Sequence, residues 1–232
     1  MFSSPCFLPA VSGYLCLMRV WWSVAVAILL ASSVWAASKP HVVVLGKWTT
    51  VKFQADDDNS AIDVKVRPLF VDGKTKEFTL GAAHEITERI FVVQRIFRVN
   101  DSLPQESGPA RWRWERGGWL LVDRVSGKVQ ALVLPEFDPN YSQANWFRDY
   151  AAYCATSDDG QKAFAIIEQL GKRKPLLRKA LAESSPEGCP APVWQRNPVR
   201  VTFATKEDPK LTFAVKSRSV DVASEDESEG EE

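Results

Sequence analysis

The stretch RWRWERGGWLLVDRVSGKVQALVL, from Arg111 to Leu134, decides the fold class of this chain. It is rich in Val, Leu and Trp, whose side chains suit the pleated and half-buried surface of a β-sheet. Two pairs divide it, Gly117-Gly118 and Ser126-Gly127, and glycine readily adopts the positive φ angles that tight hairpin turns require. Pro135 follows and ends the last segment, because proline cannot donate to a β-ladder. The stretch therefore predicts three antiparallel strands joined by two tight turns.

Side chains alternate between the two faces of a strand, so Trp112 and Trp114 share one face while Arg111 and Arg113 share the other. This alternation favours a core position for the tryptophans, including Trp119, and solvent exposure for the arginines. In the alternative interpretation the tryptophans are exposed and stack on sugar rings, while the arginines hold phosphate or carboxylate groups. The four residues 111–114 are therefore the candidate ligand-binding residues of the sequence.

The first 36 residues are typical of a secretory signal peptide. Arg19 supplies the positive region, Val20 to Leu30 forms the apolar region, and Val34-Trp35-Ala36 ends in the small-residue pattern that signal peptidase reads. The apolar run is shorter than the roughly 20 residues of a membrane-spanning helix, which favours cleavage over an uncleaved anchor. A start at Met18 would give a more ordinary signal length than a start at Met1. We expect the protein to be periplasmic or secreted.

Two of the four cysteines, Cys154 and Cys189, lie beyond the predicted signal peptide. An even pair in an exported protein favours a disulfide, and one connectivity is available. Two buried free thiols are the alternative.

Charge is distributed unevenly along the predicted mature chain. Residues 37–224 hold 28 basic and 23 acidic side chains, whereas residues 225–232 hold six acids. A densely acidic segment with few apolar residues cannot build a core. We therefore predict a disordered acidic tail over residues 223–232 and a single β-rich domain over residues 37–222.

Further apolar and β-branched runs predict more strands, and Asp72-Gly73 is the strongest short-range hairpin signal among them. Pro68 places its strand at a sheet edge or a bulge. The predicted strands are Val42 to Leu45, Trp48 to Phe53, Ile62 to Val71, Thr75 to Leu80, Arg89 to Val99, Tyr150 to Ala155, Lys162 to Glu168, Lys174 to Lys179, Val199 to Ala204 and Leu211 to Val215.

The region 146–182 also allows a helical interpretation, including a short helix near residues 176–182, because short apolar runs permit either structure. Strands are favoured because the turn at Gly160 lies 33 residues after the similar turn at Gly127. Spacing of that order suggests a repeated β-meander. The predicted fold is therefore mainly β, with antiparallel hairpins in a sandwich or a propeller-blade-like stack.

Few residues of the chain carry chemistry that could be recognised by pattern. The two histidines, His41 in a disordered start and His84 in a loop, leave no pattern for metal or triad chemistry. His84-Glu85 begins like a zincin motif but lacks its second histidine. The acidic run at Asp56 lacks the glycine and the glutamate of an EF-hand loop. No cofactor and no metal site is therefore expected.

These patterns predict a non-catalytic binding or envelope-associated module whose partner is an envelope component or a protein, with no nucleic acid expected. The basic run Lys172-Arg173-Lys174 is a candidate anion-binding site. The alternative function is a metal-independent hydrolase of envelope polysaccharide or peptide. It would use carboxylates near Glu136, Asp138 and Asp149 for general acid–base work.

Overall fold

The computed structural model of the chain describes residues 39–54, 61–103, 105, 108–157, 159–182, 189–205, 210–216 and 219–222. The predicted signal peptide, the predicted acidic tail and the acidic run at Asp56 lie outside the described residues. By its contacts the chain divides into two units, Met1–Lys39 and Pro40–Glu232. All the elements below belong to the second unit.

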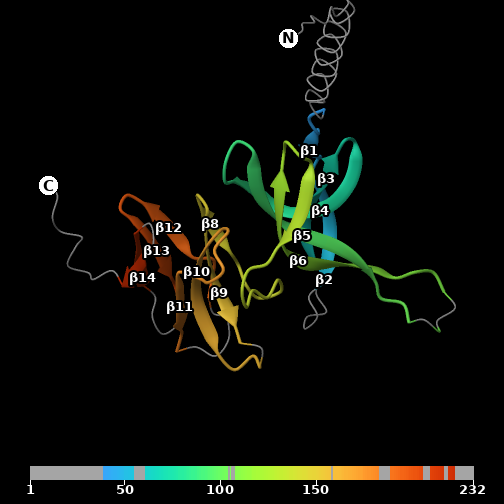
Figure 1. Ribbon diagram of the computed structural model, residues 1–232. Helices are drawn as coiled ribbons and strands as arrows, with labels where there is room; N and C mark the ends of the chain where they lie inside the picture. The colour runs from blue at the N-terminus through green and yellow to red at the C-terminus, as the bar shows by residue number, and fades with distance from the viewer. Residues whose placement is uncertain are drawn as a thin grey trace, which may run out of the picture. The chain divides into compact units, whose positions relative to one another are not determined.

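The described residues form fifteen strands and no helix, which confirms the predicted all-β fold with antiparallel pairing (Figure 1). The strands are β1 (Val43–Leu45), β2 (Thr49–Gln54), β3 (Ala61–Val71), β4 (Lys74–Glu85), β5 (Ile90–Asn100), β6 (Trp112–Asp123), β7 (Lys128–Leu132), β8 (Asn145–Phe147), β9 (Tyr150–Thr156), β10 (Ala163–Gln169), β11 (Leu177–Ala180), β12 (Val193–Arg196), β13 (Val199–Phe203), β14 (Leu211–Lys216) and β15 (Ser219–Val222).

Three sheets contain these strands. The largest has seven strands in the order β1-β3-β4-β5-β6-β7, with β2 also paired to β3. The other two have four strands each, in the orders β11-β10-β9-β8 and β12-β13-β14-β15. The short helix predicted near residues 176–182 is wrong, because residues 177–180 pair with β10 as strand β11. Pairing across the sheet therefore decides a segment whose local pattern is ambiguous.

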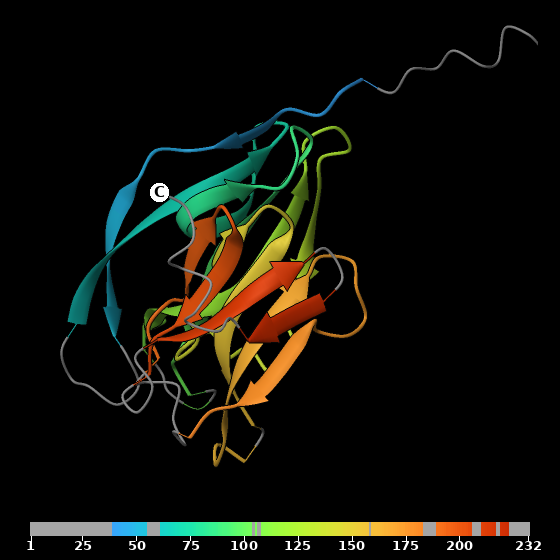
Figure 2. The same ribbon diagram turned by 90° about the vertical axis from the view of Figure 1, so that its left-hand side faces the viewer.

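Two short strands run end to end along one side of β3, as Figure 2 shows in blue. β1 pairs with Leu69–Val71 and β2 pairs with Ala61–Val66, so Pro68 faces the break between them. The carbonyl of Pro68 still accepts a bond from the backbone N–H of Gly46 at 2.8 Å. A Cβ on Gly46 would lie 2.7 Å from the Pro68 ring, so glycine is required for this approach. The missing N–H of proline is tolerated because no ladder bond is lost there.

The predicted turn at Gly117-Gly118 is wrong, because β6 continues through it as one strand of 12 residues. Trp119 lies opposite Gln94 and Arg116 lies opposite Ile96, so two glycines oppose one residue of β5. This two-against-one pairing is a β-bulge. A bulge shifts the alternation by one. Two side chains on either side of it therefore share a face when they are an odd number of positions apart. The stretch 111–134 thus contains two strands, β6 and β7, rather than three.

Apolar clusters lie on both faces of the seven-stranded sheet. The face that carries Val92, Gln94 and Ile96 is called face 1, and the other is called face 2. Face 1 carries the cluster of Phe53, Val66 and Ile96. Face 2 carries the cluster of Leu69, Phe91, Val93, Leu120 and Val122. On that face the backbone N–H of His41 reaches the carbonyl of Val125, which joins the β1 side to the β6–β7 turn. His41 is thereby held in place, in contrast to its predicted disorder, and its ring bonds Asp72 at 2.7 Å.

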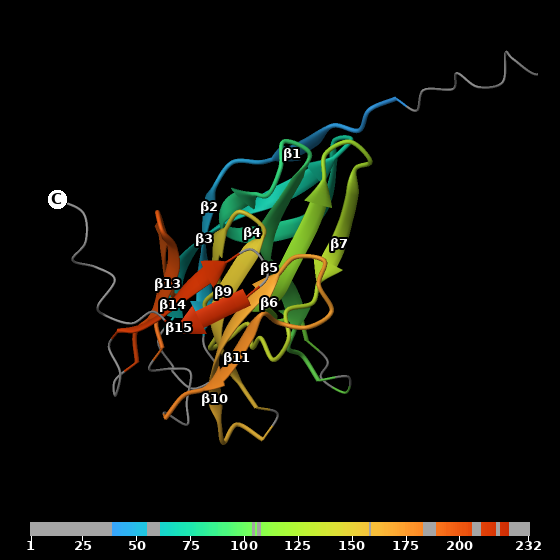
Figure 3. The same ribbon diagram turned by 60° about the vertical axis from the view of Figure 1, so that its left-hand side comes forward.

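The sheet of β9 and β10 is covered on both faces. Its alternate residues, with Tyr153 and Ile166 among them, pack against Val92 and Trp119 of the seven-stranded sheet. The intervening residues, with Cys154 and Ile167 among them, pack against β13 and β14. Figure 3 shows β13–β15 and β5–β7 on opposite sides of β9 and β10. A strand buried on both faces reads as a continuous apolar run, which explains the helical ambiguity of this region.

Candidate ligand-binding cleft

A cleft of about 530 Å³ opens on face 1 of the seven-stranded sheet, beside the contact with β8. One wall comes from β4, β5 and β6, and the other comes from the loop before β8 and from β8 itself. The side chains that give the cleft its chemistry are His84, Gln94, Arg116, Trp119, Ser142, Asn145 and Trp146. A concave site that combines aromatic rings with a few polar groups is typical of small-molecule and polymer recognition.

His84 reaches the cleft because β4 carries an irregularity. Leu80 lies opposite Gln94 and His84 lies opposite Val92, so two extra residues of β4 are accommodated between them. Gly81 in this segment has a φ of 68°, a conformation that L side chains rarely adopt. The His84 ring stacks on Trp146 at 6.0 Å, and its Nε2 lies 2.8 Å from the carbonyl of Arg148. The predicted loop position of His84 is therefore wrong, since it belongs to a strand.

Two tryptophans form the apolar part of the cleft. The rings of Trp119 and Trp146 meet edge to face at 5.3 Å, and each side chain is 8% exposed. The Nε1–H groups of both indoles are buried and find no acceptor among the described residues. Buried indole N–H groups usually find a hydrogen-bond partner. The cleft wall thus contains two buried donors that the described residues leave unsatisfied.

The wall that carries Trp146 is held by long-range hydrogen bonds. The side-chain amide of Asn145 donates to the carbonyl of Pro192 at 2.8 Å. In return the indole of Trp194 donates to the carbonyl of Asn145 at 3.1 Å. The segment around Asn145 is thus fixed by its bonds to Pro192 and Trp194, so this wall of the site is preorganised.

Arg116 gives the cleft a positive charge. No carboxylate is among the lining residues that the structure describes, and no described carboxylate pairs with Arg116. The guanidinium instead lies 5.0 Å from the ring centre of Phe53, and its Nε is buried without a partner among the described residues. An unneutralised guanidinium in a concave site favours an anionic or strongly hydrogen-bonding ligand.

A band of alternating arginine and tryptophan leads along face 1 to the cleft. We call it the Trp–Arg track, and it consists of Arg98, Trp112, Trp114 and Arg116. Arg98 lies 5.1 Å above the ring of Trp112 and 5.8 Å from that of Trp114. Because of the bulge, these residues share their face with Trp119. The track therefore continues the cleft over the surface of β5 and β6.

The expectation that Trp112 belongs to the core is wrong, because its side chain is 55% exposed. Trp114 is half-buried and meets Phe78 edge to face at 5.3 Å, and Trp119 is buried as predicted. Arg113 lies on face 2, as the alternation predicted, and its guanidinium pairs with Glu115 at 2.7 Å, while Arg111 precedes β6. Of the four candidate residues, the two tryptophans join the track and the two arginines do not.

The carboxylates considered for hydrolysis are each held by a different partner. Glu136 forms a two-bond pair with Arg178, with distances of 2.9 and 3.1 Å. Asp149 accepts from the side-chain amide of Gln169 at 2.8 Å, and Asp138 closes a turn by accepting from the backbone of Asn140.

The basic run 172–174, the candidate anion-binding site, is exposed. Lys172 lies at a second pocket, of about 230 Å³, while Arg173 and Lys174 do not line it.

Glu168 lines that second pocket, and no sequence pattern singled it out. Its side chain is 8% exposed, and its Oε2 is buried without a partner among the described residues. Burial disfavours the charged carboxylate and raises the pKa of Glu168 to about 7.

We expect the Glu168→Gln variant to be more stable than the parent at pH 8 by about 3 kcal/mol, and equally stable near pH 4. Between the unfolded pKa of about 4.5 and the folded pKa of about 7, the native protein keeps a proton that the unfolded chain has lost. Stability of the parent therefore falls as pH rises through this window, and glutamine removes that fall. Urea unfolding of both proteins at the two pH values measures the difference. An equal gap at both pH values would contradict the assignment.

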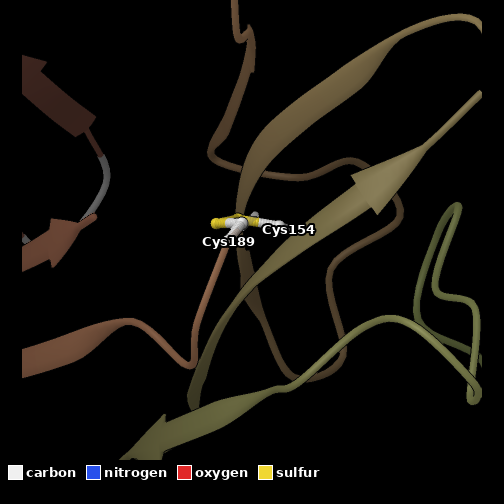
Figure 4. The surroundings of a disulfide bond; sticks show 2 residues. All are labelled: Cys154 and Cys189. Carbon is white, nitrogen blue, oxygen red and sulfur yellow. A yellow bond between two sulfur atoms is a disulfide. The ribbon is translucent and has the colours of Figure 1, made fainter. Parts of the chain in front are cut away.

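Cys154 of β9 and Cys189 are paired, as Figure 4 shows. They lie in the core between the sheet of β8–β11, which we call the middle sheet, and strands β13 and β14. Their Cα atoms are 6.2 Å apart, and the side chains are 1% and 4% exposed. The predicted partnership of the two cysteines is thus confirmed in its geometry. A pair at bonding distance is compatible with an oxidising, exported location.

No family model matches this chain, and no curated protein or solved structure is significantly similar to it. Within the described residues no group of three or more histidine, cysteine or acidic side chains is arranged to hold a metal ion. The same residues contain no helix with the length and apolar character needed to cross a membrane.

Proposed function

We propose that this protein is an exported, non-catalytic binding module of the cell envelope whose ligand lies along the Trp–Arg track and enters the cleft. The exposed ring of Trp112 carries the proposal, because an indole that is 55% exposed beneath the guanidinium of Arg98 offers a flat stacking surface. Exposed aromatic rings flanked by arginine are a recurrent arrangement for binding ring-shaped, negatively charged ligands.

The charges around the track favour an anionic polysaccharide. A sugar ring presents an apolar face to an indole, and a uronic-acid carboxylate fits the two donors of a guanidinium. Arg98 and Arg116 are both without a carboxylate partner among the described residues, whereas Arg113 on face 2 is neutralised by Glu115. The difference between the faces supports face 1 as the binding face. The separate engagement of Glu136, Asp138 and Asp149 supports binding over hydrolysis.

We expect the purified protein to bind polygalacturonate and not dextran, a neutral polysaccharide, in isothermal titration calorimetry at low salt. Replacing Trp112 with alanine should weaken binding of polygalacturonate by roughly ten-fold or more, because stacking on one aromatic ring contributes about 1–3 kcal/mol. Arg98→Gln should weaken it as well, and added salt should reduce the affinity of the parent.

Trp48 provides a matched control on face 2. Its side chain is 46% exposed and the guanidinium of Arg67 lies 4.3 Å over its ring, so it repeats the same pair on the other face. Trp48→Ala should leave polygalacturonate binding unchanged. Equal losses in the two tryptophan variants, or equal binding of dextran and polygalacturonate by the parent, would refute the proposed track.

A further inference from the structure

The second pocket adjoins the cleft at Trp146, because this tryptophan lines both. Leu132 at the end of β7, Leu134 just after it and Ala151 of β9 give it an apolar wall. Glu168 and Lys172 supply its two ionisable side chains. The pocket is separate from the Trp–Arg track, and the function proposed above does not use it.

The position of Glu168 in its strand is unusual. On β10 the side chains of Phe164, Ile166 and Glu168 share one face, and the first two belong to the core between the middle and seven-stranded sheets. A leucine at this position would extend that core, whereas a buried carboxyl without a hydrogen-bond partner destabilises the fold. A costly group that points into a pocket is typical of a binding site.

We propose that this pocket binds the ammonium group of a primary amine with a short apolar body, with Glu168 as its counter-ion. The ammonium group offers three donors, and the Oε2 of Glu168 has no other partner among the described residues. Leu132 and Leu134 contact the alkyl part, and the indole of Trp146 attracts the cation through its ring face. The volume of about 230 Å³ suits a chain of a few carbon atoms.

Among the described residues, no ionisable group near Glu168 neutralises its carboxylate, so one cation can be added. Arg178, on the same side of the sheet, is already paired with Glu136. The phenol of Tyr153 donates to the carbonyl of Pro135, and burial raises the pKa of that phenol, so it stays neutral. Lys172 is exposed at the pocket and forms no ion pair with Glu168 in the part of the chain that the structure describes. Its charge opposes a bound ammonium group.

The experiment compares n-butylammonium, n-butanol and butyrate as probes, at pH 8, where Glu168 is largely ionised. Binding to the purified protein is followed through the indole N–H signal of Trp146 in proton–nitrogen correlation spectra. We expect the amine to bind at least ten-fold more tightly than the alcohol of the same shape. Glu168→Gln should abolish this preference while the alcohol still binds, which shows that the pocket remains intact.

Lys172→Gln tests the proposal with a variant that should bind the amine more tightly than the parent does. Removing this cation should tighten n-butylammonium binding by a few-fold, because like charges repel at short range. Equal affinity for the amine and the alcohol in the parent would overturn the proposal. It would also be overturned by tighter binding of butyrate than of the amine, with a loss in Lys172→Gln, which would identify an anion site. Neither result bears on polysaccharide binding at the Trp–Arg track, which Trp112→Ala tests alone.

Discussion

Replacing Cys154 and Cys189 together with alanine is expected to lower the free energy of unfolding by about 4 kcal/mol. The two residues are 35 positions apart, and a cross-link over that distance removes much of the conformational freedom of the unfolded chain. Both side chains are buried in the core that joins the middle sheet to β13 and β14, so their loss also reduces packing there. Urea unfolding of the variant and the parent, monitored by tryptophan fluorescence, measures the change.

The parent protein in reductant is the control for the disulfide itself. If the bond stabilises the fold, reduction should bring the parent to within about 1 kcal/mol of the double variant, because alanine and reduced cysteine differ little in volume. Mass spectrometry after alkylation, with and without reductant, reports the bond directly. An alkylated mass that is the same under both conditions would show two free thiols and remove the basis of the expectation.

Tyr153→Ala is expected to destabilise the protein by about 4 kcal/mol. Tyr153 is fully buried between the middle sheet and the seven-stranded sheet, and its ring meets Phe137 edge to face at 5.5 Å. Its hydroxyl donates to the carbonyl of Pro135 at 2.8 Å. Tyr153→Phe keeps the ring and removes that bond, so it should cost about 1 kcal/mol. Urea unfolding separates the contribution of the ring from that of the hydroxyl.

Tyr141 is a suitable comparison, because it is 40% exposed in a loop of the same unit. Tyr141→Ala should change stability by less than about 1 kcal/mol. If Tyr153→Phe destabilised the protein as much as Tyr153→Ala, the hydrogen bond to Pro135 rather than the packed ring would join the two layers.

Local chemistry made the β fold predictable from the sequence. The hairpin at Asp72-Gly73 has positive φ angles of 52° and 75°, as a two-residue turn of this type requires. Strands β9, β10 and β11 were predictable because the turn at Gly160 resembles the turn at Gly127, which joins two strands. Strands β12 and β15 were not predicted, because a short exposed strand is defined by its partner rather than by its own residues. Residues 193–196 instead form a strand because β13 runs beside them.

The site was less predictable because it depends on cross-strand pairing. Arg98 and Trp112 come from different strands, and the register of β5 with β6 brings them together. The sequence suggests Arg111 and Arg113 as the arginines beside the tryptophans, but alternation places both on the opposite face. Glu168 was missed for a related reason. Its neighbours gave an apolar run, but the sequence does not reveal which residue of that run borders a pocket.

The bulge at Gly117-Gly118 lets Arg116 and Trp119, three positions apart in β6, share face 1. Deleting one glycine would leave a single residue opposite Arg95, so ordinary alternation would still keep Trp112, Trp114 and Arg116 on face 1 with Trp119. The ladder with β5 could persist, because its backbone bonds do not depend on which side chains they carry. A one-codon deletion at this bulge would therefore keep both the recognition surface of β6 and the framework that carries it.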